Sequence, residues 1–312
     1  MRMGINGTGL VQRASIDVIA NHAQRAASDG FSSYWLAEHP TGGLDALTVL
    51  TVVGLTVSDL ELGTAIIPSF PRHPMVLAGQ VLTARNAIGN RLTLGIGLSH
   101  APMMAQLGIS FDRPIRHLKE YLSILIPLLN EGRVSFTGET LSCEAETFFQ
   151  PGQPCPVVVA ALGPQALKVA GNMTNGTTLA WVGPRTIREH IRPKLTEAAE
   201  DAGRPSPRII ATLPVCVTDH EDDVRARISK TLGMYAKLPS YQAMFEREGV
   251  NEPGELALVG GESRVSDLIE ELAEVGVTDF APSEFTTNED ERERTRGLLK
   301  DWNETHHEEY ET

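Results

Sequence analysis

Residues 153–184 read Q-P-C-P-V-V-V-A-A-L-G-P-Q-A-L-K-V-A-G-N-M-T-N-G-T-T-L-A-W-V-G-P and contain the clearest pattern in the chain. Residues 157–162 form a short apolar run of strand length, rich in β-branched side chains. A helix is predicted at 165–170, because Pro164 suits the first turn of a helix. A second apolar run follows at 177–182, so the stretch predicts a β-α-β unit with tight turns.

Glycine marks every turn of this unit, at Gly163, Gly171 and Gly176. Gly171 is expected to end the helix, where glycine is common. The backbone N–H groups of Gly163, and those of Gly176 and Thr177, are candidates for holding a phosphate. Tight turns also need glycine for steric reasons, so the motif alone leaves a phosphate site and a structural role both open.

Strand-like and helix-like segments alternate on both sides of this unit, along all 312 residues. The strands look buried on both faces, as parallel strands are. About eight such units predict a single (β/α)8 barrel, with an open doubly wound sheet and a second domain as the alternative. Strands are expected at 2–6, 31–36, 62–67, 91–98, 157–161, 178–182, 209–218 and 278–281. Helices are expected at 15–29, 46–56, 75–88, 115–129, 165–170, 186–202, 221–248, 263–275 and 289–307.

One segment interrupts the alternation. Residues 134–149 alternate between apolar and polar side chains around Thr137-Gly138, which indicates a hairpin or an extended loop. We therefore expect residues 1–312 to form one barrel domain with an insertion at about 132–154. The early G-I-N-G-T-G at 4–9 lacks the spacing of a dinucleotide loop and is interpreted as a turn after the first strand.

The composition disfavours several classes of protein. With 27 Lys and Arg against 40 Asp and Glu, the net charge is −13, and no basic stripe is present to bind nucleic acid or an anionic membrane. No apolar run approaches the ~20 residues of a membrane span, and no signal peptide is recognised. Cys143, Cys155 and Cys216 are too few and too scattered for a disulfide framework or a zinc site, so we expect a cytoplasmic protein without bound metal.

The candidate site residues follow from the predicted barrel, because barrel enzymes place their chemistry at the carboxyl ends of the strands. These ends are unusually polar or glycine-rich here. They hold Asn6, Glu38-His39, Ile67, Ser99-His100, Ala161-Leu162-Gly163 and Trp181.

Several motifs, in this order and spacing, resemble the bacterial luciferase-like superfamily of flavin and deazaflavin barrels. They resemble most its coenzyme F420-dependent oxidoreductases, over most of residues 1–190. The motifs are Y-W-L-A-E-H at 34–39, L-G-T-A-I-I-P-S-F-P-R-H-P at 62–74, R-L-T-L-G-I-G at 91–97, F-D-R-P-I-R-H-L-K-E-Y-L at 111–122, F-T-G-E at 136–139, and A-A-L-G-P-Q-A-L-K-V-A-G at 160–171 with N-G at 175–176.

The resemblance implies roles around the deazaflavin ring. His39 would lie beside the ring and donate a hydrogen bond or relay a proton, the other interpretation being a histidine that caps a loop. Glu38 would be either an acid or a solvated loop residue. A bulge that in this family commonly holds a non-proline cis peptide would press on one ring face, and it would consist of Thr64, Ala65, Ile66 and Ile67.

The resemblance also implies contacts away from the ring. Ser99 and His100 would reach the ring or the cofactor tail. Gly176 and Thr177 would hold the phosphate. Asn6 and Trp181 are expected in the substrate pocket, where a core aromatic is the alternative for Trp181. The tail would be lined by the small residues Ala160, Ala161 and Gly163.

The resemblance therefore implies an F420-dependent oxidoreductase that transfers a hydride between the deazaflavin C5 and a small organic substrate, and a homodimer is expected. The chain departs from better-defined members by I-I-P at 66–68, where several carry Asn before Pro, and by Glu38-His39, where some carry Asp. An FMN-dependent monooxygenase and a non-catalytic flavin-binding barrel remain the alternatives.

Overall fold

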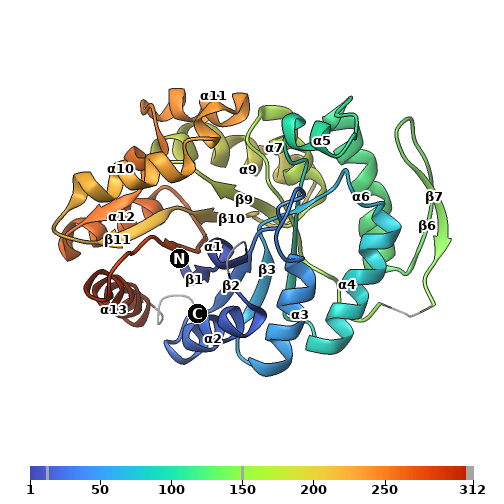
Figure 1. Ribbon diagram of the computed structural model, residues 1–312. Helices are drawn as coiled ribbons and strands as arrows, with labels where there is room; N and C mark the ends of the chain where they lie inside the picture. The colour runs from blue at the N-terminus through green and yellow to red at the C-terminus, as the bar shows by residue number, and fades with distance from the viewer. Residues whose placement is uncertain (12–13, 149–150, 307–312) are drawn as a thin grey trace.

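The computed structural model describes residues 1–11, 14–148 and 151–306. Within them, eight parallel strands close into a barrel whose order is β3-β2-β1-β13-β10-β9-β8-β5, with β3 paired to β5 (Figure 1). The predicted (β/α)8 barrel is confirmed, and the open sheet is excluded because β3 and β5 pair. The strands are β1 (Arg2–Asn6), β2 (Ser33–Leu36), β3 (Glu61–Thr64), β5 (Leu92–Gly97), β8 (Val157–Val159), β9 (Gly176–Ala180), β10 (Arg208–Thr212) and β13 (Asp279–Phe280).

Short strands continue the barrel beyond its closed ring. β4 (Ile67–Pro68) continues β3, β11 (Pro214–Val217) continues β10, and β14 (Ser283–Glu284) continues β13. β11 also pairs with β12 (Leu258–Gly260), a strand that the sequence pattern did not predict. The barrel is therefore a complete ring at the amino ends of the strands and splits into separate pairings at their carboxyl ends.

Helices surround the barrel in the expected alternation. They are α1 (Thr8–Val11), α2 (Ile16–Ser28), α3 (Ala46–Thr56), α4 (Pro74–Ile88), α5 (Ala101–Gln106), α6 (Pro114–Asn130), α7 (Pro164–Met173), α8 (Pro184–Thr186), α9 (Arg192–Asp201), α10 (Glu221–Leu232), α11 (Pro239–Glu248), α12 (Glu262–Glu274) and α13 (Glu289–His306). The main core lies between these helices and the strands. A smaller cluster groups Trp35, Val158, Ile210 and Ala281 from four barrel strands, with Ala65 packed against it.

Three predicted helices differ from the structure. α7 does not end at Gly171 but continues to Met173; a Cβ on Gly171 would lie 2.5 Å from the Leu195 carbonyl oxygen, so glycine there permits close contact with α9. The helix predicted at 186–202 contains a π-helical turn, η1 (Ile187–Ile191). The helix predicted at 221–248 is interrupted by the 3₁₀ turn η2 (Tyr235–Lys237), because Pro239 disfavours helical backbone in the residue before it.

The predicted hairpin is present as the antiparallel pair β6 (Arg133–Thr137) and β7 (Ser142–Glu146), which lies outside the ring of helices (Figure 1). Glu120 of α6 holds its turn, since the carboxylate accepts hydrogen bonds from the N–H groups of Glu139, Thr140 and Leu141. Three predictions include residues outside the described ranges: the predicted loop ends at Phe149, the predicted insertion contains Gln150, and the predicted closing helix ends at His307. None of the helices in the described ranges is long and apolar enough to cross a membrane.

Ion pairs close the barrel at the amino ends of its strands. Arg208, at the start of β10, reaches Glu61 at 2.8 Å and Asp279 at 2.7 Å. Arg2, at the start of β1, pairs with the same two carboxylates at 2.6 and 3.2 Å. Burial disfavours the charged form of Glu61, but Arg208 and Arg2 outweigh burial and lower its pKa.

Candidate active site

The carboxyl ends of the strands bring together most of the predicted site residues. Asn6 ends β1, His39 follows β2, and Trp181 follows β9. Asn6 is buried; its amide donates to the Thr212 hydroxyl at 3.3 Å and accepts the N–H of Thr8 at 2.9 Å. This side chain is therefore fixed in place between β1 and β10.

The predicted bulge interrupts the strand between β3 and β4. Leu62 pairs with Leu92 and Ile67 with Ile96, so five steps along one strand match four along the other, and one residue is extra. The Ala65–Ile66 peptide is cis. The Thr64 hydroxyl donates to the Gly95 carbonyl oxygen at 2.8 Å and accepts the Gly95 N–H at 2.8 Å. The bulge is thus bound to β5, while Ala65 and Ile66 stay half-buried.

Glycine is required on the strand facing the bulge. A Cβ on Gly95 would lie 1.9 Å from the Thr64 carbonyl oxygen, and one on Gly97 would lie 2.9 Å from the Ile66 side chain. Both distances are too short for a real contact, so the bulge can sit against β5 only because these two positions carry no side chain.

Glu38 forms an ion-paired group behind the bulge. Its N–H donates to the Ile66 carbonyl oxygen at 3.0 Å, and its carboxyl group lies 3.1 Å from Arg72, which also contacts Asp45. Burial raises the pKa of Glu38, and neighbouring Asp45 adds to the rise against the opposing effect of Arg72. The side chain of Arg72 therefore ties Glu38 to the loop after β4.

His39 has a different environment from its neighbour. Its ring is half-buried and hydrogen-bonds no other described residue. Burial lowers the pKa of His39, so the ring is neutral at neutral pH. A neutral imidazole with both nitrogens free can accept a proton from a ligand or donate a hydrogen bond to it.

The turn after β8 ends at a helix start with free donors. Gly163 is the N-cap residue of α7 and supplies no side-chain cap, and the N–H groups of Gln165 and Ala166 bond no other described residue. Such a start attracts anions through its N–H groups and the helix dipole. A Cβ on Gly163 would meet no atom within 4 Å, so its surroundings are open.

Two side chains hold this turn from behind. The His190 Nε2 lies 2.8 Å from the Leu162 carbonyl oxygen. The Thr177 hydroxyl donates to the Val159 carbonyl oxygen at 2.8 Å and accepts the Ala161 N–H at 3.3 Å. Thr177, predicted to contact phosphate, is fully buried and instead braces the turn. His190 is brought here by its position in the π-helical turn, for which the sequence contains no local signal.

Gly176 does not lie beside Gly163, contrary to the prediction that the N–H groups of both residues hold the phosphate. It is the first residue of β9 and pairs with Arg208, the first residue of β10. Gly163 follows the carboxyl end of β8, and parallel strands place starts and ends at opposite edges. Gly176 has φ 144°, and a Cβ there would lie 2.0 Å from the Arg208 carbonyl oxygen. Glycine is required at position 176 because β9 and β10 approach each other closely there.

Ser99, His100 and Trp181 follow β5 and β9. Ser99 has φ 61°, and its hydroxyl lies 3.7 Å from the Met103 sulfur, so it points toward α5. Trp181 has φ 60°. The ring of His100 contacts Tyr241 and that of Trp181 contacts Tyr235. Both tyrosines were missed because residues 221–248 were read as one helix, although Pro239 could have signalled the break.

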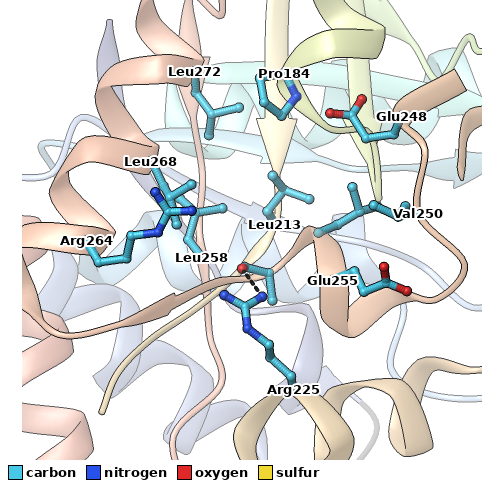
Figure 2. Close-up of a pocket in the computed structure, with 12 residues that line it drawn as sticks. Pro184, Leu213, Arg225, Glu248, Val250, Glu255, Leu258, Arg264, Leu268 and Leu272 are labelled. Carbon is cyan, nitrogen blue, oxygen red and sulfur yellow. Dashed lines mark hydrogen bonds between the residues drawn. The ribbon is translucent and has the colours of Figure 1, made fainter. Parts of the chain in front are cut away.

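A separate pocket of about 190 Å³ lies outside the barrel, between β11, β12, α12 and the end of α11 (Figure 2). Its floor is apolar, with Leu213, Leu258 and Leu272 pointing inward, while Arg225 is held by backbone carbonyls such as that of Ala257 at 3.0 Å. None of the predicted site residues lines this pocket, so we place the active site at the barrel mouth.

Two curated proteins illustrate what the chain is similar to in sequence. A 5,10-methylenetetrahydromethanopterin reductase of Methanolobus tindarius is 24% identical over 245 residues, covering 78% of this chain and 74% of that protein. An F420-dependent glucose-6-phosphate dehydrogenase of Kineococcus radiotolerans is 28% identical over 279 residues, covering 85% and 80%.

Solved structures share the fold. The coenzyme F420-dependent tetrahydromethanopterin reductase from Methanopyrus kandleri superposes with a TM-score of 0.83 at 22% identity, covering 98% of this chain and 99% of that one. The monooxygenase RslO1 from Streptomyces bottropensis gives 0.81 at 21% identity, covering 98% and 100%. Residues 3–279 match the family described as luciferase-like monooxygenase, and the chain belongs to that family.

Proposed function

We propose that the protein is an F420-dependent oxidoreductase that transfers a hydride between the deazaflavin C5 and a small organic substrate. Relatives named as F420-dependent enzymes, at 28% and 30% identity, support this proposal. The observation that carries the proposal is that two features lie next to each other. The uncapped helix start at Gly163 follows β8, and β8 pairs with β5, the strand that faces the bulge after β3.

The described residues fit the two ends of such a cofactor. Ala65 and Ile66 would support one face of the flat ring. The free N–H groups of Gln165 and Ala166 would hold the phosphate, and the exposed Gly163 leaves room for it. His190 and Thr177 would keep these donors in position by fixing the turn before α7.

Bound F420 would supply the hydride chemistry. The chain's own residues would handle the proton. When hydride leaves the carbon of a substrate alcohol, the hydroxyl proton would pass to the neutral imidazole of His39 at the end of β2, and in the reverse direction the imidazolium so formed would return that proton to the carbonyl oxygen as its carbon gains hydride. Glu38 is held by Arg72 and would keep the backbone of His39 and Ile66 in register.

Fluorescence titration of the purified protein with F420 and with FMN tests this function. We expect F420 to bind more tightly than FMN and to turn over with an added substrate. Micromolar binding of FMN without detectable binding of F420 would move the protein to FMN-dependent oxygenation. Cofactor binding without turnover of any reductant or alcohol would indicate a non-catalytic flavin-binding barrel.

We also propose that the enzyme is a cytoplasmic homodimer. Helix α3 is apolar along its whole length, yet Val52 and Leu55 are 38% and 64% exposed, which suits an interface with a second copy. Cys143, Cys155 and Cys216 are free thiols, as expected in a reducing compartment. Sedimentation of the protein and of a Leu55→Glu variant would test the dimer, since a charge there should yield monomers.

A further inference from the structure

Four rings form a continuous row at the barrel mouth. The ring centroids of Trp181 and Tyr235 are 5.4 Å apart, those of Tyr235 and Tyr241 5.5 Å, and those of Tyr241 and His100 5.6 Å. All four side chains are partly exposed. The hydroxyl groups of the tyrosines and the ring nitrogens of His100 and Trp181 hydrogen-bond no other described residue. The faces of these four rings, and the polar atoms at their edges, are therefore available to a ligand.

The topology puts this row across the proposed site. Trp181 follows β9 and His100 follows β5, and these two strands lie on either side of β8 in the barrel. The row therefore spans the carboxyl end of β8, where Ala160 begins the turn toward the cofactor's helix. The two tyrosines come from η2 and α11, a segment between α10 and α12, so the row combines three distant parts of the sequence.

The described strand ends supply no free Lys or Arg to an acidic substrate. No Lys or Arg occurs within three residues after the carboxyl end of any described barrel strand or its continuation. Arg72, one residue further along, is occupied by Glu38 and Asp45. With the N–H groups at the start of α7 occupied by the cofactor phosphate, a phosphate or carboxylate on the substrate would find no Lys or Arg at the described strand ends to offset its desolvation, which is unfavourable.

The geometry points to an uncharged substrate with a flat aromatic or conjugated ring, which stacks along Trp181, Tyr235 and Tyr241. The inference rests on the proposed function and specifies its substrate class. Aromatic rings prefer offset or edge contacts at 4.5–7 Å between centroids, and the row already has this spacing. His100, at the end of the row, is available to hydrogen-bond the polar group attached to the ring.

Tryptophan fluorescence tests the inference directly. The chain contains three tryptophans, and Trp35 and Trp302 are buried at 0% and 4% exposure, so Trp181 is the tryptophan that a ligand can reach. The protein is titrated with 2-naphthaldehyde and with 2-naphthoate, which share a ring system but differ in charge. We expect saturable quenching by the aldehyde and at least roughly tenfold weaker quenching by the carboxylate.

Variants assign the effect to the row. Tyr235→Ala should weaken aldehyde binding roughly tenfold, while Tyr235→Phe should bind nearly as the parent does, because the ring is retained. Trp181→Phe should remove the quenching signal. Phe148→Ala, a fully exposed aromatic at the end of the hairpin, is the matched control and should change nothing.

Two results would overturn the inference: equal affinity for naphthoate, or unchanged affinity in Tyr235→Ala. The titration is repeated with F420 bound, and displacement of the aldehyde by F420 would also overturn it, since substrate and cofactor must bind together. F420 binding is followed separately by the cofactor's own fluorescence. Failure to bind F420 therefore contradicts the proposed function and leaves the ring-binding result to be judged by itself.

Discussion

Gly163 and Gly176 belong to one β-α-β unit but have opposite surroundings. A Cβ on Gly163 meets no atom within 4 Å, whereas a Cβ on Gly176 would lie 2.0 Å from a backbone oxygen, at φ 144°. The first glycine leaves space for a ligand, and the second permits contact between strands. Substitution by alanine should therefore separate binding from folding.

We expect Gly163→Ala to keep the parent's melting temperature and to lose F420 affinity at least tenfold, because the added methyl group occupies the phosphate's space. Gly176→Ala should lose roughly 1–3 kcal/mol of stability from backbone strain while its folded fraction binds F420 normally. Thermal melts and fluorescence titrations of the two variants provide the measurements. A reversed pattern would return the phosphate to Gly176.

His39 is the histidine best placed for proton transfer. We predict that His39→Ala lowers turnover by roughly 10²–10⁴-fold with little change in stability, as expected for loss of a general acid or base. His220→Ala, at the exposed start of α10, is the control. Turnover and melting temperature of both variants are compared, and near-normal turnover of His39→Ala would leave His39 as a structural residue.

Among the elements, the β6–β7 hairpin depends on one side chain of α6. Glu120 accepts three backbone N–H groups and the Thr140 hydroxyl, at 2.6–3.0 Å. Burial opposes its ionisation, but the hydrogen bonds from Thr140 and the backbone of 139–141 prevail and lower its pKa to about 2. The unfolded chain therefore binds a proton at a pH where the folded protein does not.

This difference gives a pH prediction. The contribution of Glu120 to stability is complete above pH 4.5, the group's ordinary pKa, and is lost as pH falls toward about 2. Glu120→Gln should cost about 1–3 kcal/mol at neutral pH, since the amide turns an NH₂ toward backbone donors, and should flatten the acid dependence. Urea melts from neutral to acidic pH measure both, with the exposed Glu144→Gln as control. If the stability of Glu120→Gln depends on acidic pH as the parent's does, Glu120 is not the residue that holds the hairpin turn.

How far the sequence predicts each element depends on what fixes it. The strands and most helices were recognisable because buried apolar runs and glycine or proline ends are local signals. The bulge at Thr64–Ile67 came from the resemblance, the helix start at Gly163 came from Pro164 and the glycine pattern, and both coincide with real features. His190 could not be predicted, because its place depends on a π-helical turn without a local signal, whereas Tyr235 and Tyr241 were missed because the helix break that Pro239 indicates was not recognised. The position of Gly176 was misjudged because turn glycines look alike in sequence.

In the whole molecule, a largely buried network of ion pairs joins the amino ends of the strands. Arg208 there neutralises Glu61 and Asp279, and both carboxylates are largely buried. We expect Arg208→Ala to cost about 3–5 kcal/mol, because it leaves two buried charges with only Arg2 as partner. F420 affinity of the folded fraction should not change. Chemical denaturation with parallel cofactor titration tests this, using the exposed Arg264→Ala as control; equal stability of the two variants would contradict it.

The strands form a closed ring at their amino ends and split into separate pairings at their carboxyl ends. This difference has a consequence for how such a protein diversifies. The short pairings of β4, β11, β12 and β14 continue the sheet around the mouth, so we expect that loops there can lengthen or be replaced without opening the ring. The loops at the carboxyl ends can therefore change during evolution to bind other substrates, while the ring of strands at the amino ends stays the same. The reductase from Methanopyrus kandleri has 22% sequence identity with this chain, and yet the two backbones superpose with a TM-score of 0.83.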